Sequence, residues 1–315
     1  MIKILITGGA GNVGGALARR LVEDKKYFVV IADDLSTGSK SKLPSKEHDN
    51  WSFVYCDVNN YRDISELMLA YKFDYVFHYA ALVGVQRTQE NPIQVLTDID
   101  GIKNVLNLCK NTSVKRAFFS SSSEVYGEPV ELPQNEDTTP LNSRVPYAVV
   151  KNVGESFFRS FKQSFDLEFT IFRFFNTYGP NQSKDFVVAK FIALALKNEP
   201  ITIYGDGSQT RTFCYVDDNI DTCVKMFEED LYVNQTVNVG GADEITILEL
   251  AKLVIKKTNS KSVIKHLPPL KEGDMTRRMP DNSKMRGVLQ RPLITIEEGI
   301  ELLINDPVFL TQLDN

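Results

Sequence analysis

The sequence is poor in the residues that build metal centres and disulfide frameworks. It contains only three histidines, which lie far apart, and four cysteines, none of them in the C-x-x-C spacing of a metal or redox motif. We therefore expect neither a bound metal nor a disulfide framework. With no sign of disulfides, the cytoplasm is the expected compartment.

Two further absences bear on the partners of the protein. No apolar run reaches the roughly 18 residues of a membrane-spanning helix, and residues 3–8 resemble a strand and a turn rather than a signal peptide. The net charge of -5 provides no general basic face for nucleic acid, although an acidic chain can still carry a local basic pocket for a phosphate. We expect a protein that binds neither a membrane nor nucleic acid.

The first half of the sequence alternates short apolar runs with helical patterns. The runs lie at residues 2–7, 28–32, 51–56, 75–79 and 116–120, and the helical patterns at 14–23, 64–71 and 95–110. This alternation predicts an α/β fold with a Rossmann-type doubly wound parallel sheet. Ligands bind at the carboxyl ends of the strands in such sheets. At one of these ends the sequence carries four serines and Glu124.

A glycine-rich turn follows the first expected strand. Residues 7–14 read Thr-Gly-Gly-Ala-Gly-Asn-Val-Gly, and a helical pattern comes next. Glycines let the backbone approach a pyrophosphate closely, and a helix N-terminus offers amide donors. In this strand–turn–helix context the turn predicts a dinucleotide site rather than a tight turn without a ligand. The predicted contacts are Gly8, Gly11, Asn12, Val13 and Gly14.

Acidic residues follow the second and third expected strands. A carboxylate at Asp33-Asp34 can accept hydrogen bonds from both ribose hydroxyls and would repel a 2′-phosphate, so NAD is favoured over NADP. The alternative for this position is an aspartate that caps a helix or a turn. Asp57-Val58, after the third strand, is a weaker candidate for flanking the adenine.

A phenol and an ammonium lie on one face of a later helical pattern. Tyr147 and Lys151 are four positions apart. A neighbouring ammonium and an oxidised nicotinamide both favour the phenolate, so Tyr147 can act as a base near neutral pH. A hydroxyl of the serine cluster would hold the substrate alcohol. A Tyr-x-x-x-Lys pair alone is common on protein surfaces, but here it accompanies the glycine-rich turn and the serines in the expected order.

Together these segments resemble an extended short-chain dehydrogenase/reductase, the family of nucleotide-sugar 4-epimerases, 4,6-dehydratases and UDP-glucuronate decarboxylases. The resemblance covers nearly the whole chain. It rests on the segments Thr7–Gly14, Asp33–Gly38, Asp57-Val58, His78–Ala81, Ser121–Gly127, Tyr147–Lys151, Arg173–Pro180 and Gly205–Asp217. It implies an NAD-dependent enzyme that acts on a nucleotide sugar through a transient 4-keto sugar.

The resemblance also implies an organisation and an assembly. Residues 1–178 are expected to form the NAD-binding Rossmann domain with the catalytic serine and the Tyr-x-x-x-Lys pair. Residues 179–315 are expected to form mainly a smaller α/β lobe that binds the nucleotide sugar, with an interleaved boundary. In relatives, the helices near 95–110 and 147–163 pair with their copies in a homodimer. Here the apolar pairs Val105 with Leu108, and Phe157 with Phe161, are candidates for this interface.

Roles carry over from the family residue by residue. Tyr147 matches the base, Lys151 its partner on the nicotinamide ribose, and Ser122 the catalytic hydroxyl, with Ser123 and Glu124 beside it. Implied cofactor contacts, besides the glycine-rich turn and the Tyr–Lys pair, are Asp33, Asp34, Ser36, Thr37, Gly38, Asp57, Val58, Tyr79, Ala80 and Ala81. Implied substrate contacts are Val83, Thr88, Ser122, Asn176, Lys190, Tyr204, Gln209, Arg211 and Arg278. For the two arginines a surface ion pair is the alternative.

One of the departures from the family pattern lies in an expected helix. The helix near 95–110 usually carries Asn-x-x-Gly-Thr, whereas this chain has Asp98-Ile-Asp-Gly101-Ile102.

The sequence leaves the branch of the family open. Ser123-Glu124 resembles decarboxylases and GDP-mannose-type dehydratases, in which the acid serves the step after oxidation, although Glu124 can also be a solvated or helix-capping acid. Residues 80–92 are closer to the substrate loop of 4-epimerases, which need no second base. We expect a 4-epimerase for UDP-hexoses, with a 4,6-dehydratase and a UDP-glucuronate decarboxylase as alternatives. A non-catalytic NAD sensor is the alternative of another class.

Overall fold

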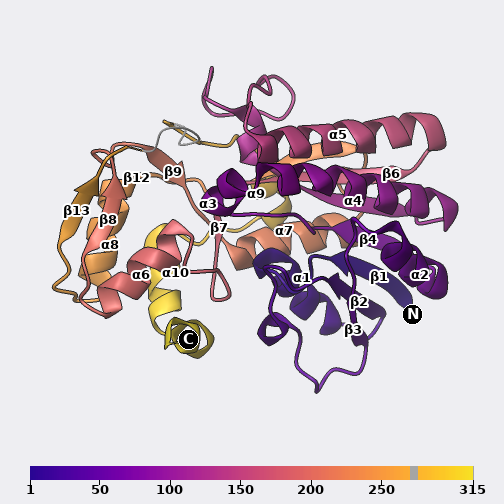
Figure 1. Cartoon of the computed structure of the whole chain (residues 1–315), viewed down its shortest axis with the longest axis horizontal. Coiled ribbons are helices and arrows are strands. Elements are labelled where there is room, and N and C mark those ends of the chain that lie inside the picture. The colour runs from indigo at the N-terminus through magenta and orange to yellow at the C-terminus, as the bar shows by residue number, and fades with distance from the viewer. Residues whose placement is uncertain (270–275, 315) are drawn as a thin grey trace. The chain divides into compact units, whose positions relative to one another are not determined.

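The computed structural model describes residues 1–269 and 276–314 (Figure 1). The chain forms two compact units, each assembled from separate segments. Unit 1 comprises Met1–Val125, Ser143–Phe174 and Ile220–Val237, and unit 2 comprises Tyr126–Asn142, Phe175–Asn219 and Asn238–Asn315. The division at residue 178 stays a prediction of where the two binding functions lie.

A parallel sheet organises unit 1. In the described residues it has seven strands in the order β11-β6-β5-β4-β1-β2-β3. Their bounds are β1 (Ile2–Thr7), β2 (Tyr27–Asp33), β3 (Trp51–Tyr55), β4 (Tyr75–His78), β5 (Arg116–Ser122), β6 (Glu168–Phe174) and β11 (Gln235–Val239), the last of which ends in unit 2. The central strands pair in parallel with their neighbours. Continuous apolar runs are typical of strands covered on both faces, and such runs predicted the five strands β1 to β5. The predicted α/β Rossmann-type fold is confirmed.

Helices connect these strands. They are α1 (Asn12–Val22), α2 (Tyr61–Tyr71), α3 (Val85–Glu90), α4 (Pro92–Asn111), α5 (Pro146–Phe165) and α7 (Val216–Glu228), which begins in unit 2. A proline opens both α4 and α5, where its missing N–H costs no helical hydrogen bond. These two helices pack against each other and run side by side in Figure 1. Gly154 permits this packing on the sheet, because a Cβ there would overlap the ring of Phe119.

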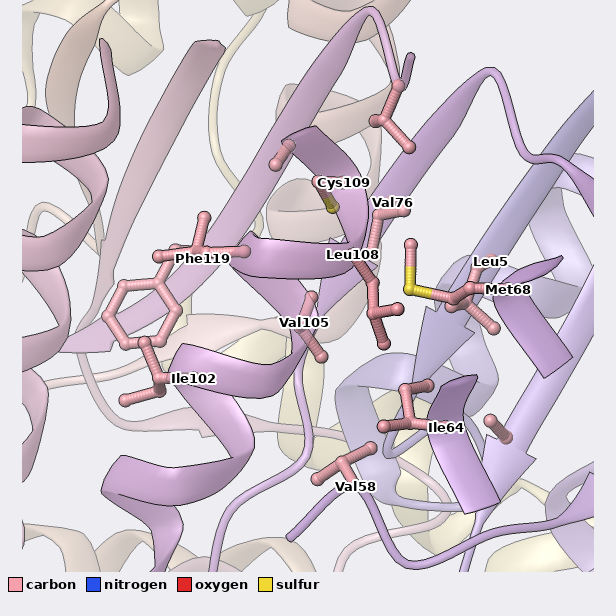
Figure 2. Packing of buried hydrophobic residues seen from close by; sticks show 14 of the residues in the cluster. Leu5, Val58, Ile64, Met68, Val76, Ile102, Val105, Leu108, Cys109 and Phe119 are labelled. Atoms are coloured by element: carbon pink, nitrogen blue, oxygen red, sulfur yellow. The ribbon is translucent and has the colours of Figure 1, made fainter. Parts of the chain in front are cut away.

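The hydrophobic core of unit 1 lies between the sheet and helices α2, α4 and α5. Figure 2 shows Met68 of α2, Val105 and Leu108 of α4 and Phe119 of β5 within this cluster. Phe161 of α5 also belongs to it. Val105, Leu108 and Phe161 are thus buried inside the subunit, so they do not provide the exposed apolar face on which the dimer interface was expected.

Unit 2 combines short paired strands with helices. Its elements are β7 (Thr177–Tyr178), α6 (Val187–Leu196), β8 (Ile201–Tyr204), β9 (Thr210–Thr212), β10 (Cys214–Tyr215), β12 (Glu244–Thr246), α8 (Ile247–Lys257), β13 (Ile264–Leu267), α9 (Ser283–Leu289), α10 (Ile296–Ile304) and α11 (Pro307–Asp314). The strands pair as β7 with β10, β8 with β13 and β9 with β12. Capping boxes begin α8 and α10.

None of the helices in residues 1–269 and 276–314 combines the length and the apolar character that crossing a membrane requires.

Candidate active site

The serines at the end of β5 differ in their surroundings. Ser120 Oγ lies 3.5 Å from Lys151 Nζ, which donates to it. Ser121 Oγ donates a 2.6 Å hydrogen bond to the buried carboxylate of Glu155. Ser122 Oγ accepts a 3.2 Å hydrogen bond from the backbone N–H of Glu124, so its own O–H is left to donate. Ser122 is therefore the serine best suited to donate to a substrate oxygen. Ser121 instead takes part in the buried interactions that stabilise the fold.

Tyr147 and Lys151 lie on the first turns of α5. Lys151 Nζ is 5.6 Å from the centre of the Tyr147 ring and 5.0 Å from that of Phe119. Lys151 is only 3% exposed. Burial lowers the pKa of Lys151 to about 8, while the carboxylate of Asp98 opposes this shift. Since this pKa still lies above neutral, Lys151 carries its charge beside Tyr147 and next to the serines of β5.

Glu124 belongs to a short 3-10 turn, Ser123–Tyr126, that follows β5. Ser123 is buried, whereas Glu124 is half-buried. The backbone N–H of Glu124 donates to Ser122, as described above, so the turn fixes the start of the Glu124 side chain beside Ser122.

The glycine-rich turn has the form that a bound pyrophosphate needs. Gly8 has φ 68°, and a Cβ there would lie 2.6 Å from Ala80 N, so only glycine fits. The N–H of Gly11 donates to Gly8 O at 3.1 Å. Asn12 begins α1, and its side-chain Oδ1 is buried with no hydrogen-bond partner in the described residues. A close-fitting turn and a helix N-terminus fit the pyrophosphate of a dinucleotide.

Asp33 ties this turn to the loop after β2. Its Oδ2 accepts a 2.9 Å hydrogen bond from the N–H of Ala10, and its Oδ1 accepts one of 2.8 Å from the N–H of Leu35. Burial raises the pKa of Asp33, and these two hydrogen bonds oppose the shift. Asp34 accepts from both the N–H and the O–H of Ser36. The structure thus gives Asp33 the turn-capping role that the sequence offered as the alternative, and the ribose contact stays a prediction.

The remaining predicted cofactor residues of unit 1 lie near this turn or in the core. The N–H groups of Tyr79 and Ala80 donate to Thr7 Oγ1 at 3.2 and 3.3 Å. The Tyr79 hydroxyl faces Cys223 in the core, so any cofactor contact of Tyr79 would come from its backbone. Val58 is also buried in the core, while Asp57 accepts from the N–H of Asn59. Thr37, Gly38 and Ala81 lie in the loops that follow β2 and β4.

Two predicted substrate residues lie in and beside α3. The Val83 carbonyl accepts a 3.0 Å hydrogen bond from the Arg87 guanidinium, and the N–H of Thr88 donates to Gly84 O at 2.9 Å. The loop and the helix are thereby held together.

The other predicted substrate residues belong to unit 2. The side-chain amide of Asn176 donates to Thr212 O in β9 at 2.8 Å. Arg211, which precedes Thr212 in this strand, is 7% exposed. Arg278 is buried to the same degree. Gln209 contacts Tyr204 O at 3.4 Å, and Lys190 is half-buried on α6. Hydrogen bonds therefore connect Asn176 to the strand that contains Arg211, and Gln209 to Tyr204.

Sequence reasoning missed a buried charge cluster next to the serines. Glu155 is fully buried and bonds Arg173 Nε at 2.8 Å and Nη2 at 2.7 Å. A signal was present, because Arg173 interrupts an apolar strand and Glu155 shares a helix face with Lys151. His78 was also missed as a core group. It contacts Thr7 Oγ1 at 2.8 Å, and burial lowers its pKa to about 3, so it is neutral and does not act as an acid.

Comparisons with known proteins show which family the chain resembles. Residues 4–240 match the model of the NAD dependent epimerase/dehydratase family. UDP-glucuronic acid decarboxylase 3 of Arabidopsis thaliana is 34% identical, over 97% of this chain and 89% of that protein. The crystal structure of UDP-glucose 4-epimerase from Thermotoga maritima with UDP-glucose has a TM-score of 0.91 at 29% identity and covers 100% of both chains.

A further structural relative is UDP-glucuronic acid 4-epimerase from Bacillus cereus in complex with UDP-glucuronic acid and NAD. Its TM-score is 0.90 at 28% identity, over 99% of this chain and 100% of that one. The family resemblance and the NAD cofactor predicted from the sequence are confirmed. The alternative of a non-catalytic sensor is therefore set aside. The chain belongs to the NAD-dependent epimerase/dehydratase family, and it is an enzyme of the group that modifies nucleotide sugars.

Proposed function

We propose that the protein is a 4-epimerase of a UDP-hexose. In this reaction Tyr147 takes the proton of the sugar C4 hydroxyl as C4 loses hydride and becomes a ketone. Ser122 holds the C4 oxygen through a donated hydrogen bond. After the ketosugar turns over, Tyr147 returns the proton to the C4 oxygen and leaves the inverted alcohol. NAD, when bound, accepts the hydride and gives it back, so no net oxidation occurs.

The observation that supports this proposal most directly is the buried ammonium of Lys151 beside the Tyr147 ring, next to the serines of β5. A positive charge in a water-poor site stabilises the phenolate that the base must become. The turn Gly8–Gly14, Asp33 and Lys151 are proposed to hold the cofactor. Two observations favour epimerisation. Glu124 is half-buried, whereas the other branches need a buried second base. The chain also resembles two 4-epimerases over its whole length.

A UDP-glucuronate decarboxylase is the second candidate. It is favoured by the 34% identity to the Arabidopsis thaliana enzyme and by a carboxylate at Glu124 next to the catalytic serine. A 4,6-dehydratase would need Glu124 in a similar place, to take the C5 proton.

We also propose that the predicted residues of unit 2 bind the sugar nucleotide. Buried guanidinium groups such as those of Arg211 and Arg278 suit a diphosphate, because each can donate two parallel hydrogen bonds. Asn176, Lys190, Tyr204 and Gln209 would complete the contacts. The cytoplasmic location remains a prediction.

The test of the proposed function is a panel of UDP-, GDP-, dTDP- and CDP-sugars incubated with the purified enzyme and analysed by NMR of the products. We expect inversion at C4 of a UDP-hexose. Loss of carbon dioxide from UDP-glucuronate, or loss of water with a 4-keto-6-deoxy product, would instead identify one of the other two branches.

Glu124→Gln separates the branches, since glutamine keeps the size and hydrogen-bonding reach of the side chain but cannot act as a base. In an epimerase we expect C4 inversion to survive within about tenfold, because base catalysis by this group, worth roughly a hundredfold or more, is not used. In a dehydratase, C4 oxidation would continue while elimination collapsed, and reduced cofactor would accumulate on the enzyme. Loss of the first hydride transfer itself, with NAD binding intact, would contradict both roles.

We further propose a homodimer through α4 and α5, formed by a second copy of this chain. Ile93 and Leu96 of α4 and Val149 and Phe165 of α5 are exposed apolar residues on the two helices. We expect light scattering to give a dimer at micromolar concentration, and Leu96→Glu to shift it towards monomer. Leu302→Glu changes a leucine of similar exposure on α10 and should leave the dimer intact. A wild-type monomer at this concentration would contradict the proposal.

A further inference from the structure

We propose that Asp98 is a positioning residue that holds the charge of Lys151 beside Tyr147. The proposal rests on the proposed function, in which Lys151 supports the base.

The packing of two helices brings Asp98 and Lys151 to the same level. Helices α4 and α5 connect successive parallel strands, so they run in the same direction. A Cβ on Gly154 of α5 would lie 3.0 Å from Ile102 Cδ1 of α4, which fixes where the helices touch. Asp98 is one turn before Ile102, and Lys151 is one turn before Gly154. Both residues therefore lie one turn beyond the contact, on the side of the helix N-termini.

The carboxylate of Asp98 is held by neighbours from two loops. The N–H of Leu82, after β4, donates to Oδ2 at 2.8 Å. The side-chain amide of Asn59, after β3, approaches Oδ1 at 3.5 Å. Asn59 is itself fixed, since its Oδ1 accepts a 3.0 Å hydrogen bond from the N–H of Gly101. A carboxylate held in this way can act on Lys151 at a fixed separation.

Asp98 is the charged side chain that acts on the pKa of Lys151. Three titratable side chains of the described residues face the ammonium, namely Asp98 from α4, His78 from β4 and Tyr147 from α5 itself. His78 is neutral, because burial lowers its pKa to about 3. Asp98 raises the pKa of Lys151 against the effect of burial. Burial in turn raises the pKa of Asp98, and the charge of Asp34 acts on it in the same direction.

The consequence concerns the alkaline side of the pH range. With Asp98, the pKa of Lys151 is about 8. Without this carboxylate, burial acts unopposed, the pKa falls, and less Lys151 is charged at neutral pH. The phenolate of Tyr147 then loses its stabilising charge, so activity should fall at a lower pH than in the wild type.

The test is a titration of Lys151 by NMR of lysine labelled with 13C at Cε, with the signal assigned by its loss in Lys151→Arg. Asp98→Asn keeps an oxygen for the Leu82 N–H but removes the charge. We expect it to lower the pKa of Lys151 by about half a unit or more. Asp100→Asn is the matched control, because Asp100 lies on the same helix, is exposed and pairs with Lys103 at 3.5 Å. It should leave the Lys151 titration unchanged.

Asp98→Glu keeps the charge and should retain most of the wild-type pKa. In the active enzyme, the alkaline limb of the kcat/KM profile should move to lower pH by the same shift in Asp98→Asn, with little change in KM. An unchanged Lys151 titration in a folded Asp98→Asn protein overturns the proposal. The titration needs no substrate, so failure of the enzyme to turn over any nucleotide sugar would refute the proposed function without affecting this result.

Discussion

Tyr147→Phe is expected to lower the rate of hydride transfer by about a hundred- to ten-thousand-fold, the usual worth of a positioned general base. Phenylalanine keeps the ring that lies 5.6 Å from Lys151 Nζ but has no oxygen to take the C4 proton. The measurement is the formation of reduced nicotinamide in a single turnover with the nucleotide sugar that the panel identifies. Because the same base serves epimerisation, dehydration and decarboxylation, the loss should be seen in every branch.

Two controls make this result specific. NAD binding by the variant should be close to wild type, since the glycine-rich turn and Asp33 are untouched. Tyr61→Phe removes a phenol from the exposed start of α2 and should leave the rate unchanged. A Tyr147→Phe enzyme that forms reduced cofactor at the wild-type rate would show that another group is the base.

The sequence was sufficient where local chemistry is strict. The turn at residues 7–14 could be recognised because Gly8 occupies a backbone conformation and a close approach that only glycine tolerates. The strands could be recognised because burial on both faces requires continuous apolar runs. Tyr147 and Lys151 could be paired because helical spacing alone puts them on one face.

The sequence was insufficient where the partner is distant in the chain. Spacing on α4 could not tell that Val105 and Leu108 face the sheet rather than a second subunit, since both surfaces require apolar residues. The run of serines after Phe119 gave no sign that Ser121 is tied to Glu155, while Ser122 keeps its O–H. Likewise, the side chain of Tyr79 turns to Cys223, 144 positions away in the sequence.

The buried interactions of Glu155 affect both the position of Ser121 and the stability of the fold. Its Oε1 accepts hydrogen bonds from Ser121 and Arg173, and its Oε2 accepts from Arg173 and Arg159, the latter at 2.9 Å. Arg173 is 2% exposed. Ser121 directly precedes Ser122, so the cluster also fixes the end of β5.

Glu155→Gln is expected to reduce the free energy of unfolding by about 3–5 kcal/mol, because it leaves the buried guanidinium of Arg173 without its counter-charge. The measurement is urea denaturation at neutral pH, where the midpoint should fall while the slope stays the same. Glu66→Gln is the control. It breaks an exposed pair with Arg62 on α2, so it should cost less than about 0.5 kcal/mol.

The pH dependence of this loss provides a second check. Burial by itself raises the pKa of Glu155, but the hydrogen bond and charge of Arg173, together with Ser121 and Arg159, outweigh it and hold the pKa below its usual range. A group with a lowered pKa in the folded state stabilises the protein above its unfolded pKa, about 4.3 for glutamate, and loses this effect as the pH falls through the folded pKa. The difference between wild type and Glu155→Gln should therefore be full at neutral pH and shrink below about pH 4. A difference that stays constant down to that range would mean that the loss comes from packing rather than from the charge of Glu155.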